Sequence, residues 1–369
     1  MNFKKNYFAP GRVNLIGEHL DYNGGLVMPC AIDLGISATV TNHTEGEIKF
    51  TSEAHANEFH FQISALPESQ PKNEWSNYPL GIFKHLQNEG QNLPSIAISF
   101  ASNLPEGSGL SSSAAIEVLT AYIVQDLLEI QIDRKQLAQF CQKVENDFIG
   151  VKCGIMDQFA VANGKKEHAL LLDCNTLNYE HIPFELDNYS LLILNSKKPR
   201  SLIKSAYNER KASCDEALRL LQQHAPIQTL AEARMEHLLL LKDEELIKRA
   251  RHVIAEQLRV NLSKKMLENG DLFTFGKLMN ASHASLKDDF EVSGFELDTL
   301  AETAQDLPGC LGARMTGAGF GGCAIALVKK EFITSFSEVI RTTYTKATGL
   351  NCEVYTTSAC DGVTKLNTQ

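Results

Sequence analysis

Polar side chains that could bind a sugar or another polyol are concentrated near the start of the chain, in residues 9–25. They are Arg12, Asn14, Glu18, His19, Asp21 and Asn23, and glycines at positions 11, 17, 24 and 25 alternate with them. This pattern is typical of a loop that presents side chains to a polar ligand. The alternative is a solvated hairpin in which Asn23 and Gly24 form the turn and Glu18 and Asp21 face water. The density of glycine favours the ligand-binding loop.

A second stretch, residues 104–118, has the chemistry of a phosphate site. It reads Leu104-Pro-Glu-Gly-Ser-Gly-Leu-Ser-Ser-Ser-Ala-Ala-Ile-Glu-Val118, and apolar residues at helical spacing follow it. Gly107 and Gly109 allow positive φ angles and a close approach of the backbone to a ligand. The three serines at 111–113 lie where the first amides of a helix lack intrahelical partners, and the helix dipole favours an anion there. On these residues alone, a helix cap without a ligand remains an equal alternative.

Two carboxylates further along the chain occur in surroundings that could perturb them. Asp157 lies between Met156 and Phe159, so a buried Asp157 must be paired or hydrogen-bonded. It is therefore either half of a structural ion pair or a catalytic group, and the sequence leaves both possibilities open. Glu145 lies near the end of a predicted helix over residues 134–148, where a solvent-facing glutamate is the alternative to a metal ligand.

A third stretch, Gly312-Ala-Arg-Met-Thr-Gly-Ala-Gly-Phe-Gly-Gly-Cys323, is a glycine-rich loop that leads into an apolar strand over 324–328. A dinucleotide-binding fingerprint places its glycines after a strand and at the start of a helix. The order found here therefore argues against a Rossmann nicotinamide site. A loop that closes over a phosphate, or that supports the phosphate loop at 104–113, fits better.

The elements that must position these residues can be predicted from periodicity. We expect strands at 34–41, 48–52 and 59–63 in an antiparallel sheet, a helix over about 75–87, and a strand at 96–100 that leads into the phosphate loop. Further strands are predicted at 169–174 and 190–195, and long amphipathic helices at 201–222, 244–258 and 272–286. The change from predicted strands to long amphipathic helices places a domain boundary near 175–190. The only tryptophan, Trp75, could stack on a base or belong to the core, and Tyr207 reads first as a core aromatic.

Composition narrows the class of protein. The chain has 369 residues, of which 43% are hydrophobic, enough for two or three domains. Its formal net charge of −10 disfavours a nucleic-acid or anionic-membrane partner. Nine cysteines without a C-x-x-C pair, and the lack of a secretory leader, predict reduced thiols in the cytoplasm. No Cys or His cluster has zinc-like spacing, and the apolar runs are too short to cross a bilayer.

Together the motifs resemble one known family. The chain contains neither a Gly-x-x-x-x-Gly-Lys-[Ser/Thr] loop nor the His-Arg-Asp and Asp-Phe-Gly set of protein kinases. Residues 11–25, 104–114 and 312–323 instead resemble the three motifs of the GHMP family of small-molecule kinases, and the first resembles the motif of its galactokinase branch. Cys153-Gly-Ile-Met-Asp-Gln158 and Ser205-Ala-Tyr-Asn-Glu-Arg210 are also similar to segments of that branch. The resemblance thus covers nearly the whole chain.

The resemblance implies an α+β fold of two domains with the active site in the cleft between them. Residues 1–180 would form an S5-like α/β N-terminal domain, and residues 181–351 a ferredoxin-like α+β C-terminal domain. The tail, about 352–369, would pack back on the first domain. The implied activity is ATP-dependent phosphorylation of D-galactose at O1, the first committed step of galactose catabolism. We expect galactose, ATP and Mg²⁺ as ligands, no nucleic-acid or membrane partner, and a monomer or weak homo-oligomer.

The resemblance also implies a role for each candidate site residue. Asp157 would face the anomeric hydroxyl, with Arg12 beside it, and both would be catalytic. The implied sugar-binding residues are Glu18, His19, Asp21 and Tyr207. The implied ATP-binding residues are Trp75, Gly107, Ser108, Gly109, Leu110, Ser111, Ser112 and Ser113, and the implied Mg²⁺ ligands are Ser113 and Glu145. Leu20, Ser108 and Phe295 depart from the usual residues of the family, but none of them removes a functional group.

Two rival functions remain open at this point. One is a kinase of the same family that acts on N-acetylgalactosamine, another sugar or a non-sugar alcohol; the Glu-His-x-Asp cluster at 18–21 argues against non-sugars. The other is a sensor that binds ATP and sugar to regulate transcription without turnover. The intact Arg12, Asp157 and glycine/serine loop argue against the sensor.

Overall fold

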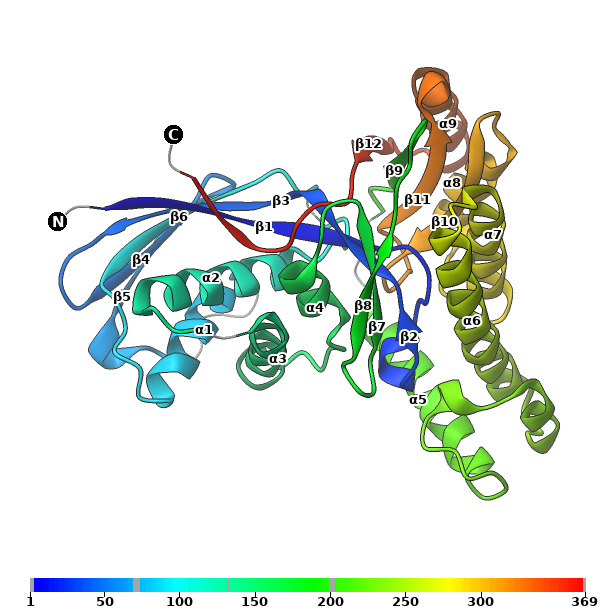
Figure 1. Cartoon of the computed structure of the whole chain (residues 1–369), viewed down its shortest axis with the longest axis horizontal. Coiled ribbons are helices and arrows are strands. Elements are labelled where there is room, and N and C mark those ends of the chain that lie inside the picture. Colours follow the sequence, from blue (N-terminus) through cyan, green and yellow to red (C-terminus); the bar gives the residue numbers. More distant parts are fainter. Residues whose placement is uncertain (1–2, 69–73, 106, 132, 199–202, 368–369) are drawn as a thin grey trace.

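A six-stranded mixed sheet forms one end of the molecule in the computed structural model, which describes residues 3–68, 74–105, 107–131, 133–198 and 203–367 (Figure 1). Its strand order is β13-β1-β3-β6-β4-β5. The strands are β1 (Lys4–Asn14), β3 (Pro29–Asn42), β4 (Glu47–Ser52), β5 (His55–Gln62), β6 (Ile96–Ser102) and β13 (Thr364–Leu366). All neighbours are antiparallel except β4 and β6, which are parallel. The tail segment β13 therefore lies beside the first strand of the chain.

The purely antiparallel sheet predicted for residues 34–63 is wrong in one respect. β6 lies between β3 and β4 and runs parallel to β4. The reason is the connection: β5 and α1 (Asn77–Asn88) lie between β4 and β6 in the chain, and parallel strands need a connection of this length rather than a hairpin. Side chains of β4 still alternate between the two faces of the sheet: Ile48 and Phe50 are buried, while Lys49 between them is half-buried.

Helices cover one face of this sheet (Figure 1). They are α1, α2 (Ser112–Leu128), α3 (Arg134–Val144) and α4 (Met156–Asn163). The helix predicted over 134–148 is α-helical only to Val144, and Glu145–Ile149 forms a π-helical turn that ends at Gly150 with φ 77°. A small antiparallel sheet of β2 (Leu26–Val27), β7 (His168–Asp173) and β8 (Tyr179–Pro183) follows. The predicted division at 180/181 falls inside β8, and the division into two domains stays a prediction.

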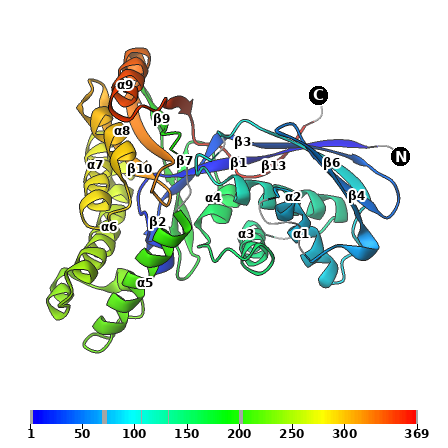
Figure 2. The same cartoon turned by 180° about the vertical axis from the view of Figure 1, so that it is seen from behind.

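The other end of the molecule is a four-stranded antiparallel sheet with helices packed against it (Figures 1 and 2). Its order is β10 (Cys310–Thr316), β11 (Cys323–Lys329), β9 (Tyr189–Asn195) and β12 (Glu353–Thr357). Leu191 and Ile193 of β9 join the larger core, whereas Leu192 and Leu194 pack with the inner faces of α8 (Phe295–Asp306) and α9 (Ile333–Thr348). Both faces of β9 are thus buried, which explains its continuous apolar run.

Three long helices complete this end: α5 (Ile203–Leu221), α6 (Glu244–Glu268) and α7 (Leu272–Asp288). The predicted start of the first at residue 201 lies outside the described residues, and α6 extends ten residues beyond the predicted end at 258. Short 3-10 turns occur at Asp21–Asn23, Ile63–Ala65, Leu230–Glu232, Met235–Leu240 and Lys330–Phe332. Within the described part of the chain, none of the helices has the length and apolar character that spanning a membrane requires.

Two stretches predicted as loops are partly strands. β1 continues through Asn14, so Arg12 and Asn14 lie on a strand and the loop begins only at Leu15. β10 includes residues 312–316, so the third glycine-rich loop is confined to 317–322. Every residue of β1 is paired with β3, and residues 312–316 of β10 are all paired with β11. This pairing outweighs the local glycine content.

Candidate active site

An open cavity of about 670 Å³ brings together residues from distant parts of the chain. It is lined by Arg12, Glu18, His19, Asp21, Gly150, Val151, Lys152, Cys153, Gly154, Met156, Asp157, Tyr207, Asn208, Gly317 and Ala318. All the predicted catalytic and sugar-binding residues are among them. Residues predicted from the first and third motifs therefore face one space, together with the turn before α4 and the start of α5.

Asp157 and Arg12 form the charged centre of this cavity. Arg12 Nε donates to Asp157 Oδ1 at 2.8 Å, and Arg12 Nη2 donates to Asp157 Oδ2 at 2.9 Å, a bidentate contact that fixes the plane of the carboxylate. Arg12 is buried, whereas Asp157, in the first turn of α4, keeps about a third of its side chain exposed to the cavity. The two readings left open for Asp157 are compatible, since it is ion-paired and accessible to a ligand.

The glycine/serine loop is tied to the same centre. Arg12 Nη1 donates to the carbonyl of Gly109 at 2.6 Å, and the Arg12 amide donates to the carbonyl of Leu110 at 3.1 Å. Gly11 has no room for a side chain there, because a Cβ would lie 2.7 Å from the Leu110 oxygen. Ser111, with φ 64°, donates its hydroxyl to Asp157 Oδ2 at 2.6 Å. Its side chain thus contacts the candidate catalytic residue.

The phosphate loop has the backbone that its sequence predicts. Gly107 and Gly109 have φ angles of 64° and 77°, and a Cβ on Gly107 would meet nothing within 4 Å. The loop ends where α2 begins at Ser112, whose side chain is exposed, and Ser113 is half-buried in the first turn. Ser108 instead turns its hydroxyl to the carbonyl of Pro105 at 2.6 Å. The binding of phosphate at this helix start stays a prediction.

Asp21 opens a 3-10 turn beside the loop at 150–154. A Cβ on Gly154 would lie 2.0 Å from Asp21 Oδ2, so only glycine leaves room for the carboxylate. The sequence motif around Asp157 contains this glycine, but nothing in the sequence indicated its contact with Asp21. Burial, and then the nearby charge of Asp157, raise the pKa of Asp21 to about 7.

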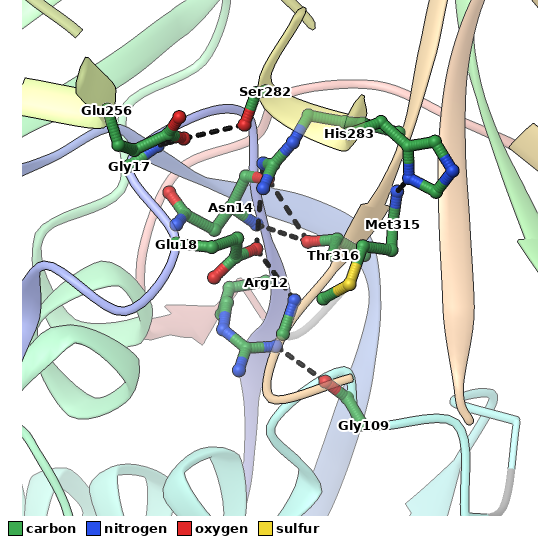
Figure 3. A network of polar contacts seen from close by, with 12 residues as sticks. Arg12, Asn14, Gly17, Glu18, Gly109, Glu256, Ser282, His283, Met315 and Thr316 are labelled. Carbon is green, nitrogen blue, oxygen red and sulfur yellow. Dashed lines mark hydrogen bonds and ion pairs between the residues drawn. The ribbon is translucent and has the colours of Figure 1, made fainter. Parts of the chain in front are cut away.

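Glu18 joins the first motif to the third (Figure 3). Its Oε1 accepts a hydrogen bond of 2.7 Å from the Gly317 amide and lies 3.6 Å from Arg314 Nη1. Burial raises the pKa of Glu18, although Arg314 opposes the shift. Arg314 also donates to the Asn14 carbonyl at 3.0 Å. Sequence reasoning missed Arg314; the available signal was a lone arginine in an otherwise uncharged strand.

The network extends from β10 into α6 and α7 (Figure 3). The Asn14 amide donates to Thr316 Oγ1 at 3.0 Å, and the Gly17 amide donates to Glu256 Oε1 at 2.9 Å. Ser282 also donates to Glu256, at 2.6 Å. The loop that carries Glu18, His19 and Asp21 is therefore fastened on both sides by elements from the second half of the chain.

His19 and Tyr207 form an aromatic wall of the cavity. The His19 ring lies 5.9 Å from the ring of Tyr207 and 4.7 Å from that of Phe290, and its Nδ1 is 3.0 Å from the Tyr22 hydroxyl. Burial lowers the pKa of His19 to about 3, so its imidazole is neutral at physiological pH. Its Nε2 has no hydrogen-bond partner among the residues that the structure describes. A ligand hydroxyl could supply one.

A group of acidic side chains lies between α2 and the π-helical turn. Glu145 is buried and accepts a hydrogen bond from Gln158 Nε2, and burial followed by the charge of Asp157 raises its pKa to about 7. Burial and the charge of Glu145 raise the pKa of Glu117 well above its usual range. Because Ser113 lies one helical turn before Glu117, we expect its hydroxyl on the face of α2 that carries Glu117. Excess negative charge and hard oxygen atoms fit a Mg²⁺ ion.

Trp75 packs against aromatic side chains of β5 and β6. Its ring contacts Phe59 and Phe100 at centroid distances of 5.6 and 5.7 Å and stacks on His55 at 6.0 Å. Trp75 is half-buried, and its Nε1 lacks a partner within the described ranges. The contacts agree with the core alternative, and the role near adenine stays a prediction.

Comparisons with known proteins agree with this geometry. Three family profiles match: the galactokinase galactose-binding signature at residues 3–42, the GHMP kinases N terminal domain at 77–165 and the GHMP kinases C terminal at 262–333. The galactokinase of Enterococcus faecalis is 47% identical over 98% of this chain and 95% of its own length. The galactokinase of Lactococcus lactis subsp. cremoris is 44% identical over 98% of this chain and 92% of its own length.

Solved structures give the same result. The crystal structure of Lactococcus lactis galactokinase complexed with galactose matches with a TM-score of 0.93 and 44% identity, over 98% of this chain and 95% of that one. A mevalonate kinase matches with a TM-score of 0.71 at 20% identity, which reflects the shared fold alone. The cavity geometry, the three profiles and these relatives agree: the chain belongs to the galactokinase family of the GHMP kinases.

Proposed function

We propose that this chain transfers the terminal phosphoryl group of ATP to O1 of D-galactose, which yields α-D-galactose 1-phosphate and ADP. The observation that carries the proposal is the Arg12–Asp157 pair in a cavity that Glu18, His19, Asp21 and Tyr207 also line. The Lactococcus relative that was crystallised with galactose has the same fold. Its ligand supports galactose as the substrate here.

Asp157 would orient the anomeric hydroxyl and accept its proton late in the reaction. Phosphoryl transfer depends mainly on positioning and on charge neutralisation, so a strong base is not required. The bidentate contact with Arg12 holds Asp157 in one orientation, and the Ser111 hydroxyl donates a hydrogen bond to Asp157 Oδ2. The rest of the carboxylate faces the cavity, where the hydroxyl would bind.

The remaining cavity residues would select the sugar. The carboxyl groups of Asp21 and Glu18 would hydrogen-bond hydroxyl groups, neutral His19 offers the Nε2 that lacks a protein partner among the described residues, and Tyr207 offers an aromatic face. Galactose and glucose differ in the orientation of O4. A site built to bond a hydroxyl in one orientation can reject the other by a factor of about 10⁴.

ATP would bind along the loop at 107–113, with its phosphates at the start of α2 and its base towards Trp75. Ser113 and Glu145 would hold Mg²⁺, with Glu117 and Gln158 behind Glu145. When bound, Mg²⁺ neutralises charge on the transferred phosphate. We further propose a cytoplasmic monomer or weak homo-oligomer; none of the nine cysteines forms a disulfide, which suits a reducing compartment.

The test is an ADP-release assay with D-galactose, D-glucose and N-acetylgalactosamine at equal concentrations. We expect a high rate with galactose, a very low rate with glucose and a low rate with N-acetylgalactosamine, whose C2 amide needs extra room. A rate with either alternative sugar that equals the galactose rate would overturn the choice of substrate. Binding of galactose and ATP without ADP release would favour the sensor over the kinase.

A further inference from the structure

Two histidines and a glutamate meet on the uncovered face of the six-stranded sheet, away from the candidate active site. We call them the outer-face cluster: His43, which follows β3, Glu47 at the start of β4, and His60 on β5. One ligand atom from each lies within 4.8 Å of the others. The alternation of β4 and β5 turns these side chains away from the buried Ile48, Phe50 and Phe61, hence away from the helices.

The backbone that carries the outer-face cluster is held by hydrogen bonds. The His43 amide donates to the Ser95 carbonyl at 3.2 Å, and the Gly46 amide donates to Ser95 Oγ at 2.9 Å. The Glu47 amide closes the turn on the Thr44 carbonyl at 3.0 Å. His60 is on a strand paired with β4, opposite Lys49. Two of the three candidate ligands thus lie on rigid strands and the third on a pinned turn, so little ordering is needed to bind an ion.

The side chains show two further features of a metal site. Gln62 Nε2 donates to Glu47 Oε1 at 2.6 Å, which fixes the carboxylate and leaves Oε2 facing His43. An outer hydrogen bond of this kind commonly orients a metal ligand. His43 Nε2 is buried and has no hydrogen-bond partner within the part of the chain that the structure describes; Glu47 Oε2 lies 3.6 Å away. A buried nitrogen without a partner is costly unless a ligand occupies it.

The types of the three ligand atoms fit a transition metal better than Mg²⁺ or Ca²⁺. Imidazole nitrogen with one carboxylate is a ligand set for zinc-like ions, whereas the hard cations prefer oxygen alone. Bonds of about 2.0–2.1 Å place tetrahedral ligands roughly 3.3 Å apart. The separation within 4.8 Å closes by rotation of the exposed His60 side chain.

The charges around the outer-face cluster permit a cation. The nearest positive group opposite His60 is Lys49, and its ammonium is paired with Glu58 at 2.8 Å. Glu58 also lies 3.7 Å from His60 Nε2. The two carboxylates, Glu47 within the cluster and Glu58 beside it, outnumber the lysine, so the local field favours a divalent ion.

We propose that His43, Glu47 and His60 form a surface site for a divalent transition-metal ion of the zinc type, with water completing a four-coordinate shell. The ion links the turn before β4 to β5. Phe59, next to His60, contacts Trp75 at a centroid distance of 5.6 Å, so the ion would also stabilise the strand that packs on Trp75. The sequence did not indicate this site, because its ligands come from separate strands and show no zinc-like spacing.

The experiment is calorimetric titration of the reduced, metal-free full-length chain with Zn²⁺, compared with His60→Ala and Glu47→Gln. His224→Ala, which changes an exposed histidine outside the outer-face cluster, is the matched control. We expect one binding event that the first two variants lose and the control keeps. Gln62→Ala, which removes only the outer hydrogen bond, should weaken that event by roughly 10- to 100-fold.

Two measurements separate this site from other Zn²⁺-binding groups, such as the cysteines and the acidic group at Glu145. Crystals grown with Zn²⁺ should show anomalous density between His43, Glu47 and His60. Zn²⁺ should raise the melting temperature of the wild-type chain and of His224→Ala more than that of His60→Ala. Equal Zn²⁺ titrations for wild type, His60→Ala and Glu47→Gln, or anomalous density only elsewhere, would overturn the proposal. All the variants are on the surface, and their ADP-release rates without Zn²⁺ should equal the wild-type rate.

Discussion

Arg314 Nη1 lies 3.6 Å from Glu18 Oε1, and both side chains are buried where the third motif meets the first. The pair places a positive charge from β10 against a carboxylate that lines the candidate sugar site. Because Glu18 also accepts the Gly317 amide, its position depends on the second half of the chain. Correct formation of the sugar site therefore requires that β10 pack against the first loop.

Arg314→Leu should destabilise the fold and weaken sugar binding. Loss of one partner of a buried ion pair typically lowers the free energy of unfolding by about 3–5 kcal/mol, because the other charge is left uncompensated. Urea denaturation would measure this, and the KM for galactose should rise more than the KM for ATP. Arg219→Ala, which removes an arginine from an exposed helical pair with Glu216, is the control and should change neither quantity. A stable Arg314→Leu variant with wild-type KM values would contradict the role of the pair.

Asp157→Asn should abolish most turnover and preserve galactose binding. The amide keeps the size of the side chain but cannot accept the proton, and loss of a general base commonly lowers kcat by roughly 10²- to 10⁴-fold. Rate measurements with saturating galactose and ATP would give kcat, and calorimetry would give the Kd for galactose. Asp187→Asn, at an exposed position with positive φ that asparagine tolerates, serves as the control. Near wild-type kcat for Asp157→Asn would remove Asp157 from the mechanism.

Much of the site could be predicted from the sequence because its residues belong to short, distinctive motifs. The backbone conformation of Gly107 and Gly109 and the gathering of Arg12, Glu18 and Asp157 around one cavity follow the prediction. The secondary-structure element that carries each site residue was harder to predict. Arg12 lies on a strand because pairing with β3 is a long-range contact that glycine content near residue 11 does not reveal.

Other features depend on tertiary contacts without a local signal. The parallel pairing of β4 with β6 joins strands that β5 and α1 separate in the chain, and nothing in either strand's sequence signals its partner. Arg314, Gly154 and Glu117 become significant only when their neighbours are known, since each acts on a residue distant in sequence. The contact between the hydroxyl of Ser111, a residue in the αL conformation, and Asp157 is also long-range, and the sequence did not indicate it.

Glu145→Ala should raise the Mg²⁺ concentration that gives half the maximal rate and leave the fold intact. The carboxylate is the strongest hard ligand in the predicted metal site, and water cannot replace its charge. Initial rates over a Mg²⁺ titration at fixed ATP would measure the change. Glu89→Ala, an exposed glutamate at the end of α1, provides the control. An unchanged Mg²⁺ titration for Glu145→Ala, with normal circular dichroism, would refute the assignment of Glu145.

Asp21→Asn should stabilise the ligand-free chain at pH 8 while it weakens galactose binding. Burial and Asp157 raise the folded-state pKa of Asp21 to about 7, above the value of about 3.9 for an unfolded chain. Its contribution to stability is thus fully present below about pH 3.9, falls as the pH rises and is lost above about pH 7. Asparagine does not titrate, so the variant should gain stability relative to wild type between pH 5 and pH 8. Urea denaturation at pH 5 and pH 8, without ligands, would measure this difference. The contributions of the other buried acids are common to the variant and the wild type, so they cancel in the comparison.

Galactose titration at pH 8 should show lower affinity for the variant, because the amide lacks the charge that a sugar hydroxyl bonds most strongly. A variant that is less stable than wild type at pH 8 would show that Asp21 is not strained in the empty site.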